Sequence, residues 1–255
     1  MHDETVELQT IVERYARCIE HVDVSTTTLG VNARTGTVYH PGFKSLNEDP
    51  AVAAIVTAWA GLFPADRLSH RLHVRYPGLP ATAKVDHVLS PVDEPQDEPE
   101  WGMEVKRLQF AGDNGKRNDY ATAKVLSPFL KDRGVLHDAA RLKHYGFTRR
   151  IAVLGYCFDY DSQTIAEARR RHSSPQALST IREIEKIVQS NGPLRIRPLV
   201  EFADAILGLK GWSAGPRAQA TFEAWTHPAG GHGTVFGWEI RRPELEVDYD
   251  PRHPW

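Results

Sequence analysis

Two strand-like segments, separated by a loop that cannot be regular, constrain the fold of this chain more than any other feature. Residues 81–89 and 101–110 each have the hydrophobic character of a strand, and an acidic stretch lies between them. Pro91, Pro95 and Pro99 interrupt that stretch, and proline removes the backbone donor that a helix or a central strand needs. The pattern predicts two antiparallel neighbouring strands joined by an acidic loop.

Charged residues within these two strands suggest a chemical site. Side chains alternate between the faces of a strand, so Glu104 and Lys106 point to one face while Met103 and Val105 point to the other. Asp86 lies near the end of the first strand, and an antiparallel register can bring its carboxylate to the same place. Two carboxylates offer Mg²⁺ the oxygen ligands it prefers, and the ammonium beside them can orient water or neutralise transition-state charge. The backbone carbonyl of Val105 is a further candidate oxygen ligand.

The Glu-x-Lys triplet alone is not specific, because chance alone should produce about one in a chain of this length. Its context carries the interpretation. It is the one such triplet in the sequence, it lies inside an apolar strand, and a strand bearing Asp86 precedes it. The alternative is a solvent-facing strand edge with a surface ion pair, which contributes little to stability.

Residues 84–89 (KVDHVL), the triplet 104–106, the helical segment after it and the apolar strand at 151–158 together resemble the core of the PD-(D/E)XK, or restriction-endonuclease-like, nuclease superfamily. The resemblance covers about residues 71–161. It implies a mixed sheet between helices and Mg²⁺-dependent cleavage of DNA, or sometimes RNA, with Mn²⁺ as a substitute. Asp86, Glu104 and Lys106 would form the active site. Val85 departs from the family's proline at that position, and Glu20 or Glu13 could supply the acid that many members draw from an upstream helix.

Charge is segregated along the chain although the net charge is only −2. The segment 104–150 carries eleven Lys or Arg residues against five acids, whereas 91–100 carries five acids and no base. A basic block of this kind can bind phosphates without reading sequence, and the alternative is a set of solvated helix faces. The residues expected to surround the cleft and bind nucleic acid are Arg107, Lys116, Arg117, Arg149 and Arg150.

The remaining segments predict a single α/β domain over residues 1–255, with a mixed central sheet flanked by helices. Residues 1–80 form an N-terminal helix and hairpin piece, 81–161 the nuclease-like core, and 162–255 a C-terminal helical and β extension. Apolar spacing and turn residues predict where the individual elements lie. Helices are expected at 5–22, 49–62, 120–133, 138–145, about 175–191 and 199–209, a hairpin within 24–40, and strands at 68–76, 221–225 and 234–240.

Composition indicates the class of protein and its cellular location. Hydrophobic residues make up 41% and charged residues 25%, which excludes a disordered or low-complexity chain. The longest apolar runs, 51–56 and 151–158, are too short to span a bilayer, and the first residues lack signal-peptide character. Two cysteines cannot form a disulfide framework. We therefore expect a soluble, cytoplasmic protein without a membrane partner.

Other functions find less support in the sequence. His70 with His73, and His227 with His232, lack the further ligands of a zinc site, and no phosphate-binding glycine loop or serine-hydrolase motif is present. The main alternative is a module of the same fold that binds nucleic acid or a protein without cutting. A carbohydrate or nucleotide hydrolase would not need the basic block. DNA is the favoured partner, and a homodimer is considered because nucleases that cut both strands often dimerise.

Overall fold

The computed structural model describes residues 6–27, 30–31, 36, 38–93, 99–118, 120–126 and 134–242. One six-stranded sheet, in the order β1-β2-β3-β4-β6-β5, forms its centre. The strands are β1 (Leu68–Arg75), β2 (Lys84–Pro91), β3 (Trp101–Leu108), β4 (Arg150–Phe158), β5 (Ala218–Ala224) and β6 (Gly231–Glu239). Strands β3 and β4 are parallel and all other neighbours are antiparallel. The predicted α/β class with a mixed sheet is confirmed.

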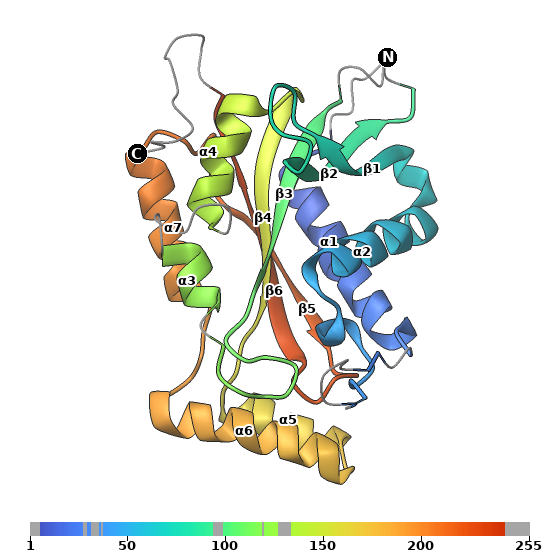
Figure 1. Cartoon of the computed structure of the whole chain (residues 1–255), viewed down its shortest axis with the longest axis vertical. Coiled ribbons are helices and arrows are strands. Elements are labelled where there is room, and N and C mark those ends of the chain that lie inside the picture. Colours follow the sequence, from blue (N-terminus) through green and yellow to red (C-terminus); the bar gives the residue numbers. More distant parts are fainter. Residues whose placement is uncertain are drawn as a thin grey trace.

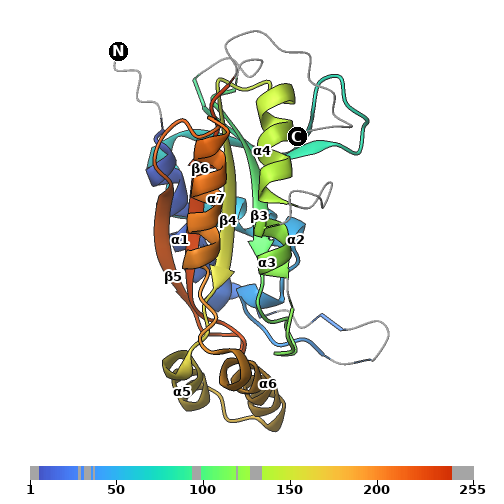
Figure 2. The same ribbon diagram turned by 90° about the vertical axis from the view of Figure 1, so that its left-hand side faces the viewer.

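Helices cover both faces of this sheet (Figure 1). Helices α1 and α2 lie on one face, α3, α4 and α7 lie on the other, and α5 and α6 lie beyond one end of the sheet, as the view in Figure 2 also shows. Their bounds are α1 (Leu8–Ser25), α2 (Glu48–Leu62), α3 (Tyr120–Leu126), α4 (Val135–Tyr145), α5 (Ser162–Arg171), α6 (Pro175–Asn191) and α7 (Arg197–Leu209). Short 3-10 helices span Phe43–Ser45 and Pro64–Asp66. Among the described helices, none has the length and apolar character needed to cross a membrane.

The two helical layers enclose two separate hydrophobic cores. Along β4, Leu154 packs in the core under α1 and α2, while its neighbour Val153 packs in the core under α4 and α7. Eight of the nine β4 residues are buried, which confirms the prediction of an apolar strand covered on both faces. On β3 the same alternation puts Met103 and Val105 in the first core, so Glu104 and Lys106 face the α4 layer.

The predicted hairpin of β2 and β3 is confirmed, and its pairing is short. Backbone pairs join Leu89 to Trp101 and His87 to Met103, and pairing ends there. Beyond that point two carboxylates replace the neighbouring strand: the amide of Val105 donates to Asp86 Oδ2 at 2.8 Å, and the amide of Arg107 donates to Glu48 Oε2 at 2.7 Å. The divergence of β2 from β3 therefore brings acidic side chains against the middle of β3.

Several element predictions need correction. Helix α1 continues to Ser25, so the hairpin expected from residue 24 does not begin there; its described part is a single bridge between Val31 and Val38, and residues 28–29, 32–35 and 37 lie outside the described residues. The helix predicted at 120–133 is observed at 120–126, and 127–133 lie outside the described residues. Helix α5 was not predicted, because its apolar stripe is short and three consecutive arginines follow it. Asp161 caps this helix by accepting a hydrogen bond from the Thr164 amide.

Candidate active site

The structure brings Asp86, Glu104 and Lys106 together. The Lys106 ammonium lies 4.0 Å from Asp86 Oδ2 and 4.0 Å from Glu104 Oε2. All three side chains line a cavity of about 840 Å³ between α4 and the β1–β2 turn. Asp86 comes from β2, and Glu104 and Lys106 come from β3, where their two-residue spacing puts both side chains on the same face.

Asp138, from α4, is the nearest partner of Lys106. Its Oδ2 lies 2.9 Å from the Lys106 ammonium, and its Oδ1 accepts from the Arg141 guanidinium at 2.9 Å. These two α4 residues are three positions apart and therefore lie on one helix face. Asp138 is completely buried, so the two cations supply the compensation that a buried carboxylate requires.

Glu104 is held by two donors and is almost fully buried, with 1% of its surface exposed. Its Oε1 accepts from the Tyr76 hydroxyl at 2.5 Å and from Arg141 at 2.9 Å. Burial, followed by the nearby charges of Asp138 and Asp86, raises the pKa of Glu104 well above its ordinary value. Burial also raises the pKa of Asp86, although Lys106 opposes the change. A cation near these two carboxyls therefore favours their ionised forms.

Glu48, in the first turn of α2, is another acid that lies beside Lys106. Its Oε1 lies 3.5 Å from the Lys106 ammonium, while its Oε2 accepts from the Arg107 amide and from Lys124 on α3 at 2.8 Å. Burial opposes ionisation of Glu48, but Lys106 and Lys124 outweigh it and lower the pKa of this carboxyl.

Neither Glu20 nor Glu13, the predicted upstream acids, reaches the cavity. Both lie on α1, where Glu20 Oε1 accepts from the Glu223 amide of β5 and Glu13 accepts from Gln9. Three strands separate β5 from β2 in the sheet. The prediction of Glu20 as a metal ligand was wrong because α1 packs on the face of the sheet opposite to Asp86, and Glu20 contacts β5 there.

Four carboxylates surround the Lys106 ammonium: Glu48, Asp86, Glu104 and Asp138. Burial alone would lower the pKa of Lys106, but these carboxylates raise it above its ordinary value. Lys106 therefore stays protonated at neutral pH. It can donate hydrogen bonds and stabilise negative charge, and it cannot serve as a base that removes a proton from water.

Potential ligand atoms of Asp49, His73 and Asp86 all lie within 4.8 Å of one another. Asp49 follows Glu48 on α2, and His73 lies on β1 across from Asp86 with a left-handed φ of 52°, a conformation that non-glycine residues adopt at a cost. Two carboxylates and an imidazole fit a divalent cation, and the nitrogen donor suits Mn²⁺ better than Mg²⁺. Glu104 does not belong to this group of three.

The Val105 carbonyl faces the same gap between β2 and β3. The N–H and C=O of one residue in a strand point to the same neighbour, and the Val105 N–H points to Asp86. This backbone oxygen is therefore directed toward the side of β3 on which Asp86 lies, and its role as a metal ligand stays a prediction.

On the opposite face of β2, histidines form a neutral hydrogen-bonded chain. The Tyr15 hydroxyl lies 2.7 Å from His87 Nδ1, and His87 Nε2 lies 3.0 Å from His70 Nδ1. Burial, with a contribution from His70, lowers the pKa of His87 to about 3, and burial lowers the pKa of His70 to about 4. His70 therefore belongs to the core side and His73 to the cavity side, which excludes a shared zinc site.

The second histidine pair does not form a metal site among the described residues either. His227 is buried, and its Nδ1 accepts from the Ala229 amide. His232 is exposed and lies 3.4 Å from Glu223.

Two of the predicted phosphate-binding arginines have internal partners instead. The Arg107 guanidinium is buried and donates to the Lys44 carbonyl and to Asp113. Arg150 pairs with Glu7 and Glu239, and its guanidinium lies 4.1 Å from the centre of the Trp101 ring. These contacts stabilise the fold, so the prediction that both arginines line the catalytic cleft was wrong.

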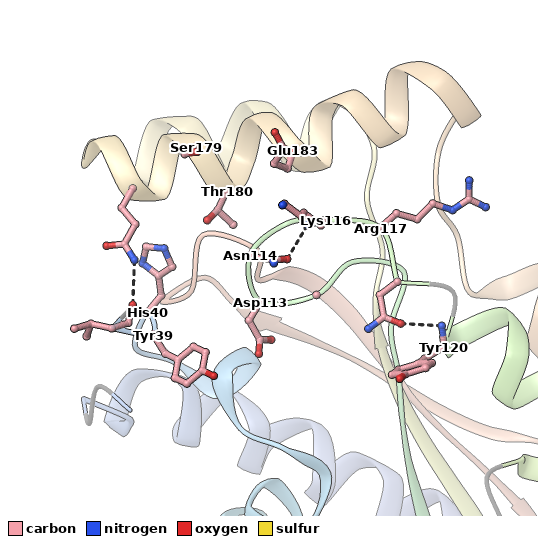
Figure 3. A pocket seen from close by; sticks show the side chains of 14 residues that line it. Tyr39, His40, Asp113, Asn114, Lys116, Arg117, Tyr120, Ser179, Thr180 and Glu183 are labelled. Atoms are coloured by element: carbon pink, nitrogen blue, oxygen red, sulfur yellow. Dashed lines mark hydrogen bonds between the residues drawn. The ribbon is translucent and has the colours of Figure 1, made fainter. Parts of the chain in front are cut away.

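The other three predicted cations lie away from the carboxylate cavity. Lys116 and Arg117 are exposed and line a different cavity, of about 970 Å³, beneath α6 (Figure 3). Arg149 is exposed immediately before β4, where its amide donates to the Pro99 carbonyl, and it lines neither cavity.

The sequence interpretation missed Glu48, Asp49, His73, Asp138 and Arg141. An acidic first turn is common in helices because carboxylates interact favourably with the helix dipole, so Glu48 and Asp49 carried no separate signal. Asp138 and Arg141 have the spacing of an ordinary surface ion pair. The sequence around His73 suggests only a pairing with His70, and no local pattern connects it to Asp86.

Comparison of the chain with family models, with curated proteins and with solved structures found no match. The arrangement of Asp86, Glu104 and Lys106 against Glu48 and Asp138 is therefore the observation on which a functional proposal for this chain depends.

Proposed function

We propose that this protein is a nuclease that uses a divalent metal ion to hydrolyse phosphodiester bonds, with DNA as its substrate. The observation that carries the proposal is the position of the Lys106 ammonium, 4.0 Å from both Asp86 and Glu104 on the wall of an open cavity. Asp49 and His73 lie in the same cavity lining. A cluster of carboxylates beside a fixed cation is suited to a reaction in which negative charge builds on phosphoryl oxygens.

The side chains divide the work. Asp86, with Asp49, His73 and the Val105 carbonyl, would hold Mg²⁺ or Mn²⁺, and Glu104 lies deeper, where it is fixed by Tyr76 and Arg141. When bound, the metal ion would polarise the phosphoryl group and acidify a water molecule. Lys106 donates a hydrogen bond to the attacking water or to the phosphoryl oxygen. Asp138 keeps the ammonium in place.

The carboxylates also make the binding of nucleic acid to this cavity depend on a metal ion. Glu48, Asp49, Asp86, Glu104 and Asp138 would repel a polyanion, and Lys106, Lys124 and Arg141 offset only part of that charge. Nucleic acid should therefore bind this cavity only together with a cation. We expect binding to the cavity to depend on divalent metal even where no bond is cut.

The alternative is a module that binds nucleic acid without cutting it. The exposed cations Lys116 and Arg117 favour it, because they lie in a cavity apart from the carboxylates and could bind phosphates by themselves. The buried carboxylate cluster argues against it, since a module that only binds a polyanion gains nothing from desolvated acids facing the ligand.

A cleavage assay with a matched variant tests the proposal. Plasmid, linear duplex and single-stranded DNA are incubated with the protein in Mg²⁺, in Mn²⁺ or in EDTA, beside Lys106→Ala and the control Lys210→Ala at an exposed position on the end of α7. We expect metal-dependent cleavage by the wild type and by Lys210→Ala. The cleavage rate of Lys106→Ala should be at least about a hundredfold lower than that of the wild type, because the substitution removes a preorganised donor from the reacting group.

The outcomes separate the candidates. Equal cleavage by Lys106→Ala and the wild type would remove Lys106 from the mechanism. No cleavage by the wild type with any substrate and metal, while nucleic acid still binds, would favour the module that does not cut. Thermal unfolding of each variant shows whether a loss reflects the site or the fold. Light scattering on the same samples tests the homodimer, which remains a prediction, as does the cytoplasmic location.

A further inference from the structure

The proposed chemistry makes no use of the cavity beneath α6. It has a volume of about 970 Å³ and lies between α6, the loop that follows β3, and the segment 38–40. Figure 3 shows Lys116 and Arg117 on the loop beside α6, and Tyr120 at the start of α3. Asn114, Asn118 and Gln176 add amide groups, and Ser179 and Thr180 add hydroxyl groups, to the same lining.

The loop that carries the two cations is fixed in place. Gly115 has a φ of 75°, and a Cβ atom there would lie 2.1 Å from the Thr180 carbonyl oxygen, so only glycine allows this close approach to α6. The Asn114 side chain accepts from the Lys116 amide at 3.0 Å, and Ala111 bridges to Arg117. Lys116 and Arg117 therefore extend from a short, closed turn.

Two cations and two acids line this cavity. Asp113 is paired with Arg107 at 2.9 Å and Glu183 with Lys186 at 2.6 Å, so both acids have cationic partners outside the lining. Arg117 donates to Asn191 Oδ1 at 3.4 Å, and Lys116 acts electrostatically on Glu183. An anion can contact Lys116 and Arg117 here, whereas the carboxylate cavity would repel it.

An aromatic ring accompanies these cations. Tyr120 has 56% of its surface exposed, and Tyr39 lines the same cavity. Exposed aromatic faces beside Lys and Arg are the elements with which proteins bind single strands, because an unstacked base can lie on a ring while the cations bind its phosphates. Bases inside a duplex are already stacked on one another.

Helix α3 connects this cavity to the proposed active site. Tyr120 begins α3, and Lys124 lies four residues later, about 6 Å along the helix axis. Lys124 donates to Glu48, and Glu48 lies 3.5 Å from the Lys106 ammonium. Strand β3 runs directly from Lys106 into the loop that bears Lys116 and Arg117.

We propose that the cavity beneath α6 binds single-stranded nucleic acid, with a base stacked on Tyr120 and phosphates bound by Lys116 and Arg117. The inference rests on the proposed nuclease function in one respect: the strand held here is the continuation of the strand presented to Lys106. The preferred substrate is then a single strand or a duplex with a single-stranded tail.

Fluorescence anisotropy tests this proposal without cleavage. A labelled 20-nucleotide oligothymidylate is titrated in EDTA with the wild type, Tyr120→Ala, Tyr120→Phe and the double variant Lys116→Gln/Arg117→Gln. Arg182→Gln is the matched control, since Arg182 is exposed on α6 and does not line the cavity. Tyr120→Ala should weaken binding about tenfold, whereas Tyr120→Phe and Arg182→Gln should stay within about twofold of the wild type.

Salt dependence and a duplex competitor complete the test. The double variant should reduce the slope of log affinity against log salt by about 1.4, which corresponds to two phosphates of a single strand. Unchanged binding in Tyr120→Ala and in the double variant would overturn the proposal, even if the wild type cleaves DNA. Equal sensitivity of duplex binding to Tyr120→Ala would overturn the single-strand assignment. Binding as expected, without cleavage by the wild type in any metal, would instead contradict the nuclease function.

Discussion

Asp86 and His87 are neighbours on β2, yet they enter two polar networks of opposite character. Asp86 faces the α4 layer, where four carboxylates surround Lys106. His87 faces the α1 layer, where it joins Tyr15 and His70 in a chain of neutral groups. Both networks bury polar atoms in the same sheet. The first uses charge and lies beside an open cavity, whereas the second uses neutral hydrogen bonds and is closed in the core.

The comparison indicates which network is kept for chemistry. A neutral chain satisfies buried donors and acceptors without desolvating charge, so it is the less costly way to fill a core with polar groups. Clustered carboxylates raise one another's pKa and are stable only near cations. We infer that the charged network around Lys106 persists for function and that the Tyr15–His87–His70 chain serves packing.

The largest effect is expected from Asp138→Ala in the charged network. The substitution leaves Lys106 and Arg141 without their shared buried partner, and breaking a buried ion pair in this way typically costs about 3–5 kcal/mol. Urea denaturation should show this decrease in the free energy of unfolding, with Asp161→Ala, an acid that caps α5, as a smaller control. A decrease below about 1 kcal/mol for Asp138→Ala would contradict a structural role for this carboxylate.

A smaller effect is expected from His73→Ala. Loss of the imidazole should weaken Mn²⁺ binding at least about tenfold and Mg²⁺ binding less, because the nitrogen donor favours the transition metal. Isothermal titration calorimetry measures both affinities, and His70→Ala on the opposite face serves as the control. Equal losses in the two histidine variants, or none in either, would remove His73 from the metal site.

In the neutral chain, Tyr15→Phe removes one hydroxyl and leaves a buried nitrogen of His87 without a partner. The expected loss in the free energy of unfolding is about 1–2 kcal/mol. Chemical denaturation measures it, and cleavage activity should stay unchanged because Tyr15 lies on the face away from the cavity. A loss of activity without a loss of stability would show that the two faces are coupled.

The smallest effect concerns pH. The pKa of His70 is lowered to about 4, so the unfolded chain, with a histidine pKa near 6.5, binds more protons between these values. Stability is then full above pH 6.5 and falls as the pH decreases toward 4. Between pH 7 and pH 5 we expect the wild type to lose about 1 kcal/mol more than His70→Gln, after allowance for partial solvent exposure. A steeper loss in His70→Gln would contradict a neutral His70.

Local patterns in the sequence predicted the part of the site that β2 and β3 supply. The two-residue period of β3 put Glu104 and Lys106 on one face, and the hairpin around the proline-bearing loop brought Asp86 beside them. Glu48, His73 and Asp138 could not be found this way, since their positions depend on how α2, β1 and α4 pack against β3.

Charge counting failed for a related reason. The net charge of a segment does not reveal whether an arginine faces water or a partner within the protein. Arg107 and Arg150 form part of the basic block, but Asp113, Glu7 and Glu239 already neutralise them. Lys116 and Arg117, from the same block, remain exposed because the turn at Gly115 holds them outside the sheet.

The amides of Val105 and Arg107 give their hydrogens to carboxylates instead of to a neighbouring strand. This stretch of β3 is therefore kept in register on that side by the ionisation of two acids, and protonation of Asp86 and Glu48 would release it. The protection factors of these two amides against hydrogen–deuterium exchange, corrected for the intrinsic pH dependence of exchange, should therefore rise when a cation binds and fall in acid.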